Sequence, residues 1–232
     1  MNPEKKRFYY SLIIPGLFVV LIWIIKISEV VLQIDFTNWG LYPLRIENLH
    51  GIITAPLVHK DMNHLLANTL PLLVLGVGVF YFYRSVALKV FLLIYVISGL
   101  WLWFGGRPGY HIGASGVIYG LASFLFFSGV FRKYIRLMAI SLLVAFLYGG
   151  MIWGLLPLDA KTSWEGHLFG GVAGLITAIF YKNRGPQRRK YDWEIEEELD
   201  EQYGGQWDEY DWEIHYYYNS KNKRNEKDKP HK

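Results

Sequence analysis

The sequence predicts an all-α polytopic membrane protein with a bundle of six transmembrane helices. Of its 232 residues, 52% are hydrophobic, and the apolar residues fall in long blocks that end near residue 183. The blocks hold few charges, and Lys and Arg gather at their ends, which is typical of helices that cross a bilayer. Buried helices of a soluble protein are the alternative, and so many nearly uncharged blocks argue against it.

The first block covers residues 8–27 and directly follows Lys5, Lys6 and Arg7. A basic start before an apolar stretch is also typical of a secretory signal, but the apolar core of such a signal has only about 7–15 residues. The block here is longer, and no small-residue cleavage site follows it. We interpret it as the first transmembrane helix, followed by a loop over 28–62 that lies in the membrane interface.

Five more blocks complete the predicted bundle, and each is close to the roughly 20 residues that cross a hydrocarbon core. They cover residues 63–83, 85–104, 114–131, 134–153 and 165–182. The membrane domain is thus expected at 8–183, with a short N-terminal segment at 1–7 and a tail at 184–232.

The placement of Lys and Arg predicts the orientation of the bundle, because these residues gather on the cytoplasmic side. One side carries Lys5, Lys6, Arg7, Arg84, Lys89, Arg132, Lys133, Arg136, Lys182, Arg184, Arg188, Arg189 and Lys190. The other side carries Lys26, Arg45, Lys60, Arg107 and Lys161. Both termini are therefore predicted to be cytoplasmic, and the second, fourth and sixth helices begin at the outer face. The formal net charge of +4 thus reflects membrane orientation, and no nucleic-acid partner is expected.

The tail at 184–232 differs in composition from the rest of the chain. The pentapeptide Tyr-Asp-Trp-Glu-Ile occurs at 191–195 and again at 210–214, around an acidic run, and the chain ends in a Lys-rich stretch. Such a segment buries little apolar surface, so we expect a solvated, disordered tail. A binding motif for an unknown partner is the alternative interpretation of the repeat.

Polar residues gather at one end of the bundle, where they are costly and therefore suggest function. The second helix begins with His64 and Asn68, which share a face because they are four residues apart. The fourth helix begins with Ser115, and the sixth begins with His167. The predicted topology brings all four residues to the same depth, near the outer face.

Glycines on two helices offer a way to bring Ser115 and His167 together, since small residues allow membrane helices to approach closely. On the sixth helix, the face of His167 carries Gly170, Gly171 and Gly174. On the fourth helix, the small residues are Gly116 and Gly120, with Tyr119 one turn below Ser115.

A serine and a histidine within hydrogen-bond reach can act as nucleophile and general base. No carboxylate lies inside the predicted helices to orient His167, so we predict a catalytic dyad with Tyr119 packed against the imidazole. An oxyanion would be supported by the backbone N–H of Ser115, by Gly113, and by the side chains of His64 and Asn68.

Other interpretations of these residues exist. Ser115 could be a helix N-cap, and His111 is a weak rival base in the loop before it, whereas His50 and His59 receive no role. The spacing of a zinc protease is absent, and Val117 replaces the second glycine of a Gly-x-Ser-x-Gly elbow. The chain has no cysteine, which excludes disulfides and thiol catalysis. We expect no metal and no cofactor.

Taken together, these motifs resemble the rhomboid family of intramembrane serine proteases over residues 8–183. The resemblance rests on the following residues: His64 and Asn68, then Gly113-Ala114-Ser115-Gly116 with Tyr119, then Gly166-His167 with Gly170 and Gly174. It implies that Ser115 is the nucleophile and His167 the base. It also implies that His64 and Asn68 support the oxyanion and that Tyr119 stacks on the base. The Trp-Arg pair that many members carry in the first loop is not evident; Leu49-His50-Gly51 stands in about that place.

The function that follows from this resemblance is hydrolysis of peptide bonds in or near transmembrane segments of other proteins. Water should reach the dyad through a cavity bordered by the loops at 105–112 and 154–165, and the latter loop should move with the fifth helix to admit a substrate. An inactive relative that binds membrane helices is one alternative, and a transporter or channel is another. A prokaryotic cytoplasmic membrane, with lipid and membrane-protein substrates as partners, is the expected setting.

Overall fold

The computed structural model describes residues 2–133, 135–147, 153–157 and 163–184, together with Trp193, Glu197 and Glu201. The chain divides into two compact units, Met1–Arg188 and Arg189–Lys232. The predicted tail and its repeated pentapeptide fall almost entirely outside the described residues, so the expectations for them stay predictions.

The elements of the first unit in its described part are all helices, and its only β pairing there is one isolated bridge between Leu41 and His111. Its α-helices are α1 (Pro3–Leu32), α2 (Gly51–Thr54), α3 (Met62–Phe82), α4 (Ala87–Gly105), α5 (Ser115–Phe131), α6 (Ile135–Leu147) and α8 (Trp164–Phe180). The predicted all-α class is confirmed for this part of the chain. Six of these helices lie where the six apolar blocks were predicted, and α2 is a short addition.

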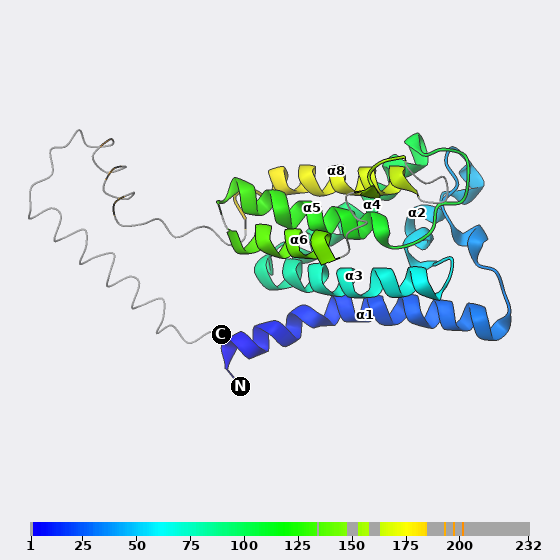
Figure 1. The fold of residues 1–232 in the computed structure, drawn as a ribbon, viewed down its shortest axis with the longest axis horizontal. Helices are drawn as coiled ribbons and strands as arrows, with labels where there is room; N and C mark the ends of the chain where they lie inside the picture. The colour runs from blue at the N-terminus through cyan, green and yellow to red at the C-terminus, as the bar shows by residue number, and fades with distance from the viewer. Residues whose placement is uncertain are drawn as a thin grey trace, which may run out of the picture. The chain divides into compact units, whose positions relative to one another are not determined.

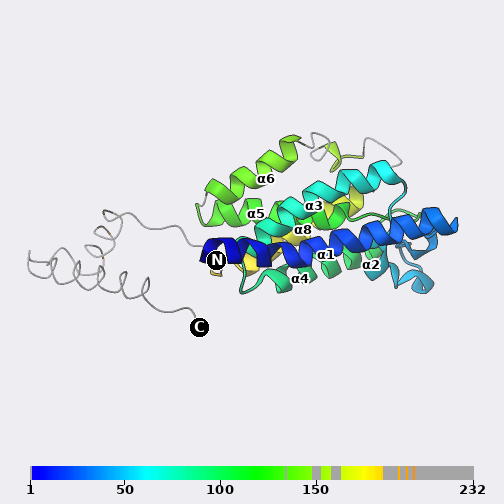
Figure 2. The ribbon, with the colours of Figure 1, turned by 90° about the horizontal axis from the view of Figure 1, so that it is seen from below.

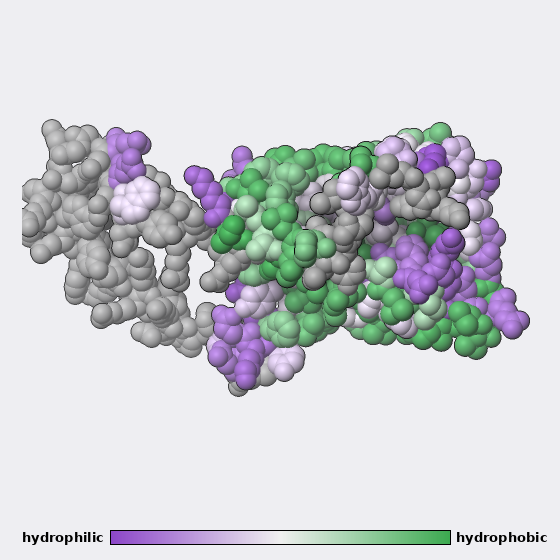
Figure 3. Space-filling model, viewed as in Figure 1, coloured by the Kyte–Doolittle hydropathy of each residue, from purple (hydrophilic) through white to green (hydrophobic). Residues whose placement is uncertain are grey.

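In the part of the chain that the structure describes, three helices are long and apolar enough to cross a membrane: α1, α3 and α4. Helix α5 is equally apolar but has 17 residues, which is slightly short for a full crossing. Helix α6 is described only to Leu147, so the rest of the predicted fifth block lies outside the described residues. The protein is thus an integral membrane protein, and the count of six spans stays a prediction. On the face of the first unit that Figure 3 shows, apolar residues cover the middle and hydrophilic residues gather at both ends, as expected of such a protein.

Helix α5 is the central element of the bundle. Its most extensive contact is with α8, and it also packs against α6, α3 and α4. Helix α1 lies along α3, and α6 sits at the edge beside α5 (Figures 1 and 2). The contacts between α3, α4 and α5 form the core, in which Leu72, Leu75, Ile94, Leu121 and Phe124 are fully buried.

The predicted interfacial loop at 28–62 is more structured than expected. Its start is still helical, because α1 continues to Leu32. After α1 the chain forms three short 3-10 helices and α2; the 3-10 helices are η1 (Thr37–Trp39), η2 (Ile46–Asn48) and η3 (Ala55–Leu57). Two backbone hydrogen bonds join Leu41 to His111, and the indole of Trp103 donates to the Arg45 carbonyl at 3.1 Å. This loop is therefore fixed to α4 and to the segment that precedes α5.

The opposite end of the bundle is joined by Arg132, which follows α5 and is buried. Its guanidinium donates to the Tyr83 hydroxyl after α3 at 3.1 Å and to the carbonyls of Tyr181 and Arg184 after α8. Helices α3, α5 and α8 are thereby held together far from the polar cluster, which limits how they tilt against one another.

Candidate active site

Ser115 is the first residue of α5 and not its cap. Ala114 occupies the N-cap position and makes no side-chain capping bond. The Ser115 hydroxyl lies 2.9 Å from Nε2 of His167 on α8. The interpretation of Ser115 as a simple N-cap is therefore wrong, because its hydroxyl is directed to a neighbouring helix.

The imidazole of His167 is held at both nitrogens. Its Nδ1 lies 2.8 Å from the Gly154 carbonyl oxygen, which can only accept a hydrogen bond. Nδ1 must therefore carry the proton in the neutral ring, and Nε2 is left to accept from the Ser115 hydroxyl. The side chain is nearly buried, with 8% of the residue exposed. The ring is thus held in the tautomer that a general base requires.

Tyr119 covers one face of this imidazole. The two rings are stacked, with centroids 4.2 Å apart and planes 9° from parallel. Tyr119 lies one turn after Ser115 on the same helix, so α5 positions both the hydroxyl and the ring against His167. This stacking fixes the plane of the imidazole, while the Gly154 carbonyl fixes its rotation.

Glycines form the contact between α5 and α8. A Cβ added at Gly170 would lie 2.0 Å from the Gly116 carbonyl oxygen, and one added at Gly174 would lie 2.1 Å from that of Gly120. Gly171 has open space at its Cβ position, although its carbonyl accepts from the Ser123 hydroxyl of α5. Of the three predicted glycines on α8, two therefore face α5, and the resulting approach brings Ser115 to His167.

His64 and Asn68 lie on the same side of α3, as their spacing predicts. Asp61 caps this helix and accepts from the His64 backbone N–H at 2.8 Å. Asn68 is buried, and its amide donates to the His64 carbonyl at 2.8 Å, which occupies one of its two N–H groups. The start of α3 is therefore a fixed platform for both side chains.

Gly113 supplies space for His64. Its φ of +109° suits glycine, and a Cβ there would lie 2.5 Å from Cε1 of His64. Its N–H donates to the Ala55 carbonyl at 2.9 Å and is therefore not free to bind an oxyanion in this conformation. The Ser115 N–H, in contrast, belongs to the first turn of α5, whose N–H groups have no acceptor within the helix.

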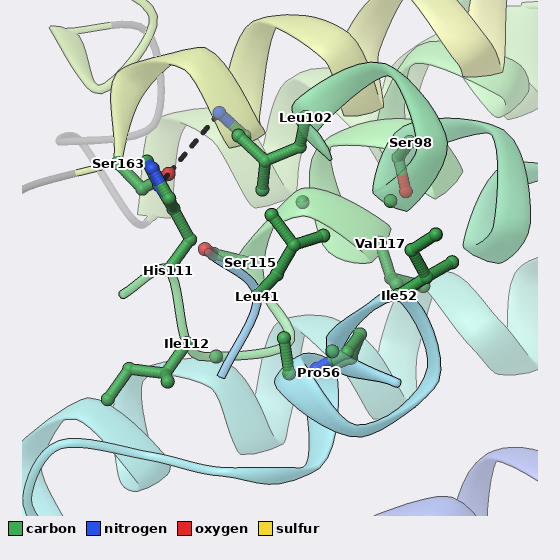
Figure 4. Close-up of a pocket in the computed structure, with 16 residues that line it drawn as sticks. Leu41, Ile52, Pro56, Ser98, Leu102, His111, Ile112, Ser115, Val117 and Ser163 are labelled. Carbon is green, nitrogen blue, oxygen red and sulfur yellow. Dashed lines mark hydrogen bonds between the residues drawn. The ribbon is translucent and has the colours of Figure 1, made fainter. Parts of the chain in front are cut away.

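A small cavity of about 40 Å³ opens beside Ser115 (Figure 4). It is lined by residues of the first loop, α4, the loop before α5, and the starts of α5 and α8, among them Leu41, Ile52, Ser98, His111, Ser115 and Ser163. The predicted border at 105–112 thus includes His111 and Ile112, and Ser163 comes from the predicted 154–165 border. In the described residues, no group of acidic, His or Cys side chains is arranged to hold a metal ion.

Two loop histidines that the predicted site did not include, His59 and His111, lie next to it. His59 is buried, accepts from the Ala114 N–H at 3.4 Å, and has its ring centroid 5.1 Å from that of His64. Burial, followed by the nearby His64, lowers the pKa of His59 to about 4. His111 is bonded to Ser163 and not to Ser115, which excludes the rival base in this arrangement. Neither pairing can be read from helical spacing, because both histidines lie in loops.

The fold and the site together define a helical membrane protein in which a serine and a histidine from two closely packed helices are hydrogen-bonded. The Rhomboid domain profile matches residues 47–184. Uncharacterised proteins of Mycobacterium bovis and Mycobacterium tuberculosis are 36% identical over 186 residues, which cover 74% of this chain and 75% of theirs. One of Mycobacterium leprae is 32% identical over 181 residues, 74% of this chain and 71% of its own. The chain belongs to the rhomboid family.

Proposed function

We propose that this protein is an intramembrane serine endopeptidase that cleaves peptide bonds in or near transmembrane segments of other membrane proteins. The observation that carries the proposal is the 2.9 Å contact between Ser115 Oγ and His167 Nε2, with the other ring nitrogen bonded to Gly154. Membership of the rhomboid family, whose members are generally intramembrane proteases, supports the same reaction class.

In this mechanism Ser115 Oγ attacks the carbonyl carbon of the scissile bond while His167 Nε2 takes the hydroxyl proton. The tetrahedral intermediate then expels the amine, which receives that proton from Nε2, and leaves an ester on Ser115. Water hydrolyses the ester with the same histidine as base. General-base assistance of this kind is typically worth about 10²–10⁴-fold in rate.

The oxyanion needs hydrogen-bond donors, each worth roughly 10²–10³-fold. The Ser115 N–H lies at the positive end of α5 and suits this role. The second N–H of Asn68 and the His64 ring are the side-chain donors that we assign, and Gly113 allows the His64 ring to come close. Tyr119 keeps the base in plane.

We further propose that substrate helices enter between α3 and α6. Helix α6 lies at the edge of the bundle and makes only a small contact with α3 (Figure 2). Because the chain has no native cysteine, a disulfide engineered between α3 and α6 is easily verified. Such a crosslink should block cleavage of a transmembrane substrate and restore it on reduction. Full activity of the crosslinked protein would argue against this entry route.

The setting that we propose is a prokaryotic cytoplasmic membrane with both termini on the cytoplasmic side. The excess of Lys and Arg on that side supports the orientation, and the mycobacterial relatives support a bacterial membrane.

The decisive experiment compares the wild type with Ser115→Ala and His167→Ala in liposomes that contain a transmembrane substrate. Matched controls are Ser123→Ala, whose hydroxyl donates to the Gly171 carbonyl further along α5, and His50→Ala in the first loop. Cleavage should fall at least about 100-fold in the first two variants and persist in the controls. Undiminished cleavage by either site variant would contradict the dyad. A wild type that binds the substrate without cleaving it would favour the inactive helix-binding relative.

A further inference from the structure

A second serine–histidine pair lies beside the proposed dyad. His111 Nδ1 is 2.6 Å from the Ser163 hydroxyl, and both residues line the same cavity as Ser115 (Figure 4). His111 lies four residues before Ser115, and Ser163 lies four residues before His167. Both pairs therefore join the same two segments of the chain, with the same sequence separation of 52 residues.

The hydrogen bonds of this second pair have a fixed direction. His111 Nε2 lies 3.0 Å from the Arg107 carbonyl, which can only accept, so Nε2 carries the proton and Nδ1 accepts from the Ser163 hydroxyl. Burial lowers the pKa of His111, which favours the neutral ring that this arrangement requires. Ser163 Oγ in turn accepts from the Gly166 N–H at 3.3 Å and thereby caps α8. The loop before α5 is thus bonded to the cap of the helix that carries His167.

An ion pair adds to this connection. The carboxylate of Glu165 lies 3.4 Å from Nε of Arg107, and its side chain is only 5% exposed. Glu165 is in the first turn of α8, two residues before His167. The Arg107 side chain therefore engages the first turn of α8, while the Arg107 backbone carbonyl accepts from His111 in the loop before α5.

We infer that His111 and Ser163 are positioning residues that fix the register between the starts of α5 and α8, and so hold Ser115 at hydrogen-bond distance from His167. The expected effect on the reaction rate of Ser115 rests on the proposed function. The glycine contact sets how close the two helices lie. The second pair adds a side-chain hydrogen bond between the two segments that lead into these helices, four residues from the reacting atoms. A displacement of about 1 Å at the reacting atoms costs up to about 100-fold in rate.

The test compares His111→Phe, which fills the ring volume without its hydrogen bonds, with Ser163→Ala and the conservative Ser163→Thr. His50→Phe is the matched control, because His50 is also a loop histidine whose ring nitrogens contact two backbone carbonyls. Two rates are measured in liposomes: labelling of Ser115 by a fluorophosphonate, and cleavage of a transmembrane substrate. We expect both rates to fall about 10- to 100-fold in His111→Phe and Ser163→Ala. For substrate cleavage the loss should be in kcat, with KM unchanged. Ser163→Thr and His50→Phe should match the wild type.

The outcomes separate this inference from the proposed function. Labelling of Ser115 without cleavage by the wild type would refute the protease activity and leave the positioning role to be judged by the labelling rates. Wild-type labelling rates in His111→Phe or in Ser163→Ala would overturn the inference. So would a probe found on Ser163 itself, because Ser163 would then be a nucleophile.

A second measurement does not depend on activity, so it applies even if the probe does not label the wild type. It also provides for a variant that does not fold. In ¹⁵N-histidine spectra, the ring nitrogens of His167 are assigned by their loss in His167→Ala. Folding of each variant is checked by its thermal unfolding, and Ser163→Ala serves if His111→Phe does not fold. The His167 signals should move in either positioning variant and stay in place in Ser163→Thr. Unmoved His167 signals in a folded His111→Phe or Ser163→Ala protein would refute the inference.

Discussion

Replacing Gly170 by alanine should separate α5 from α8 and slow the reaction of Ser115. The added Cβ would lie 2.0 Å from the Gly116 carbonyl oxygen, and ordinary contact begins at 3.4 Å. The helices must therefore move apart by about 1.4 Å at this point. The opposing atom belongs to the backbone of α5 and cannot rotate away as a side chain could.

The expected magnitudes follow from this displacement. A shift of roughly 1 Å between nucleophile and base costs about 100-fold in rate. Overpacking costs about 1–3 kcal/mol of stability, which is partly offset by a gain of about 1 kcal/mol when alanine replaces glycine in a helix. We therefore expect Gly170→Ala to fold with a slightly lower thermal midpoint and to react with a fluorophosphonate 10- to 100-fold more slowly.

Gly171→Ala is the matched control on the same helix. A Cβ at Gly171 meets nothing within 4 Å, so this variant receives the helix-propensity gain without the clash. Its thermal midpoint should equal or exceed that of the wild type, at an unchanged labelling rate. If Gly170→Ala reacts as fast as Gly171→Ala, the close approach of the two helices does not set the distance from Ser115 to His167.

Three further predictions concern neighbouring residues. The lowered pKa of His59, about 4 against an ordinary 6.5, means that the folded state binds fewer protons than the unfolded state. As the pH falls from 6.5 towards 4, His59 takes up a proton more readily in the unfolded state, so the free energy of unfolding decreases. The thermal midpoint should therefore drop across that window, and less so in His59→Gln. Tyr119→Leu should be labelled about 2- to 10-fold more slowly than Tyr119→Phe, because only phenylalanine keeps an aromatic ring against the imidazole. Gly113→Ala should lower both the thermal midpoint and the labelling rate, because a Cβ there collides with His64 at 2.5 Å; Gly109→Ala, which also has a positive φ but open space, should lower stability alone.

The parts of the site that lie on regular helices could be predicted from the sequence. The four-residue spacings of His64 and Asn68 and of Ser115 and Tyr119 each define one helix face, and helix geometry alone places such pairs together. The approach of α5 to α8 follows from glycines at matching heights, since few other residues allow such contact. Gly171 shows the limit of this reasoning, because a stripe of small residues does not tell which member faces the partner.

The contacts made by loops could not be predicted. His111 lies in a segment without regular spacing, and its partner Ser163 is 52 residues away. Ser163 did carry a local signal, since serine followed by an acidic residue is typical of a helix start. That signal predicts a cap and says nothing about what else the hydroxyl binds. The extra structure between α1 and α3 was missed for a similar reason, because its short helices are held by contacts with α4 and the loop before α5.

The Gly154 carbonyl gives the proposed base an unusual vulnerability. In a catalytic triad the group that orients the histidine is a side chain, and a single point mutation deletes it. Here the orienting group is part of the main chain, so no amino-acid substitution removes it directly. It is lost only when the segment at 153–157 shifts. A lipid or a bound protein that displaces this segment would allow the proton of the His167 ring to move from Nδ1 to Nε2. The protein would then lose its activity although every catalytic side chain is still present.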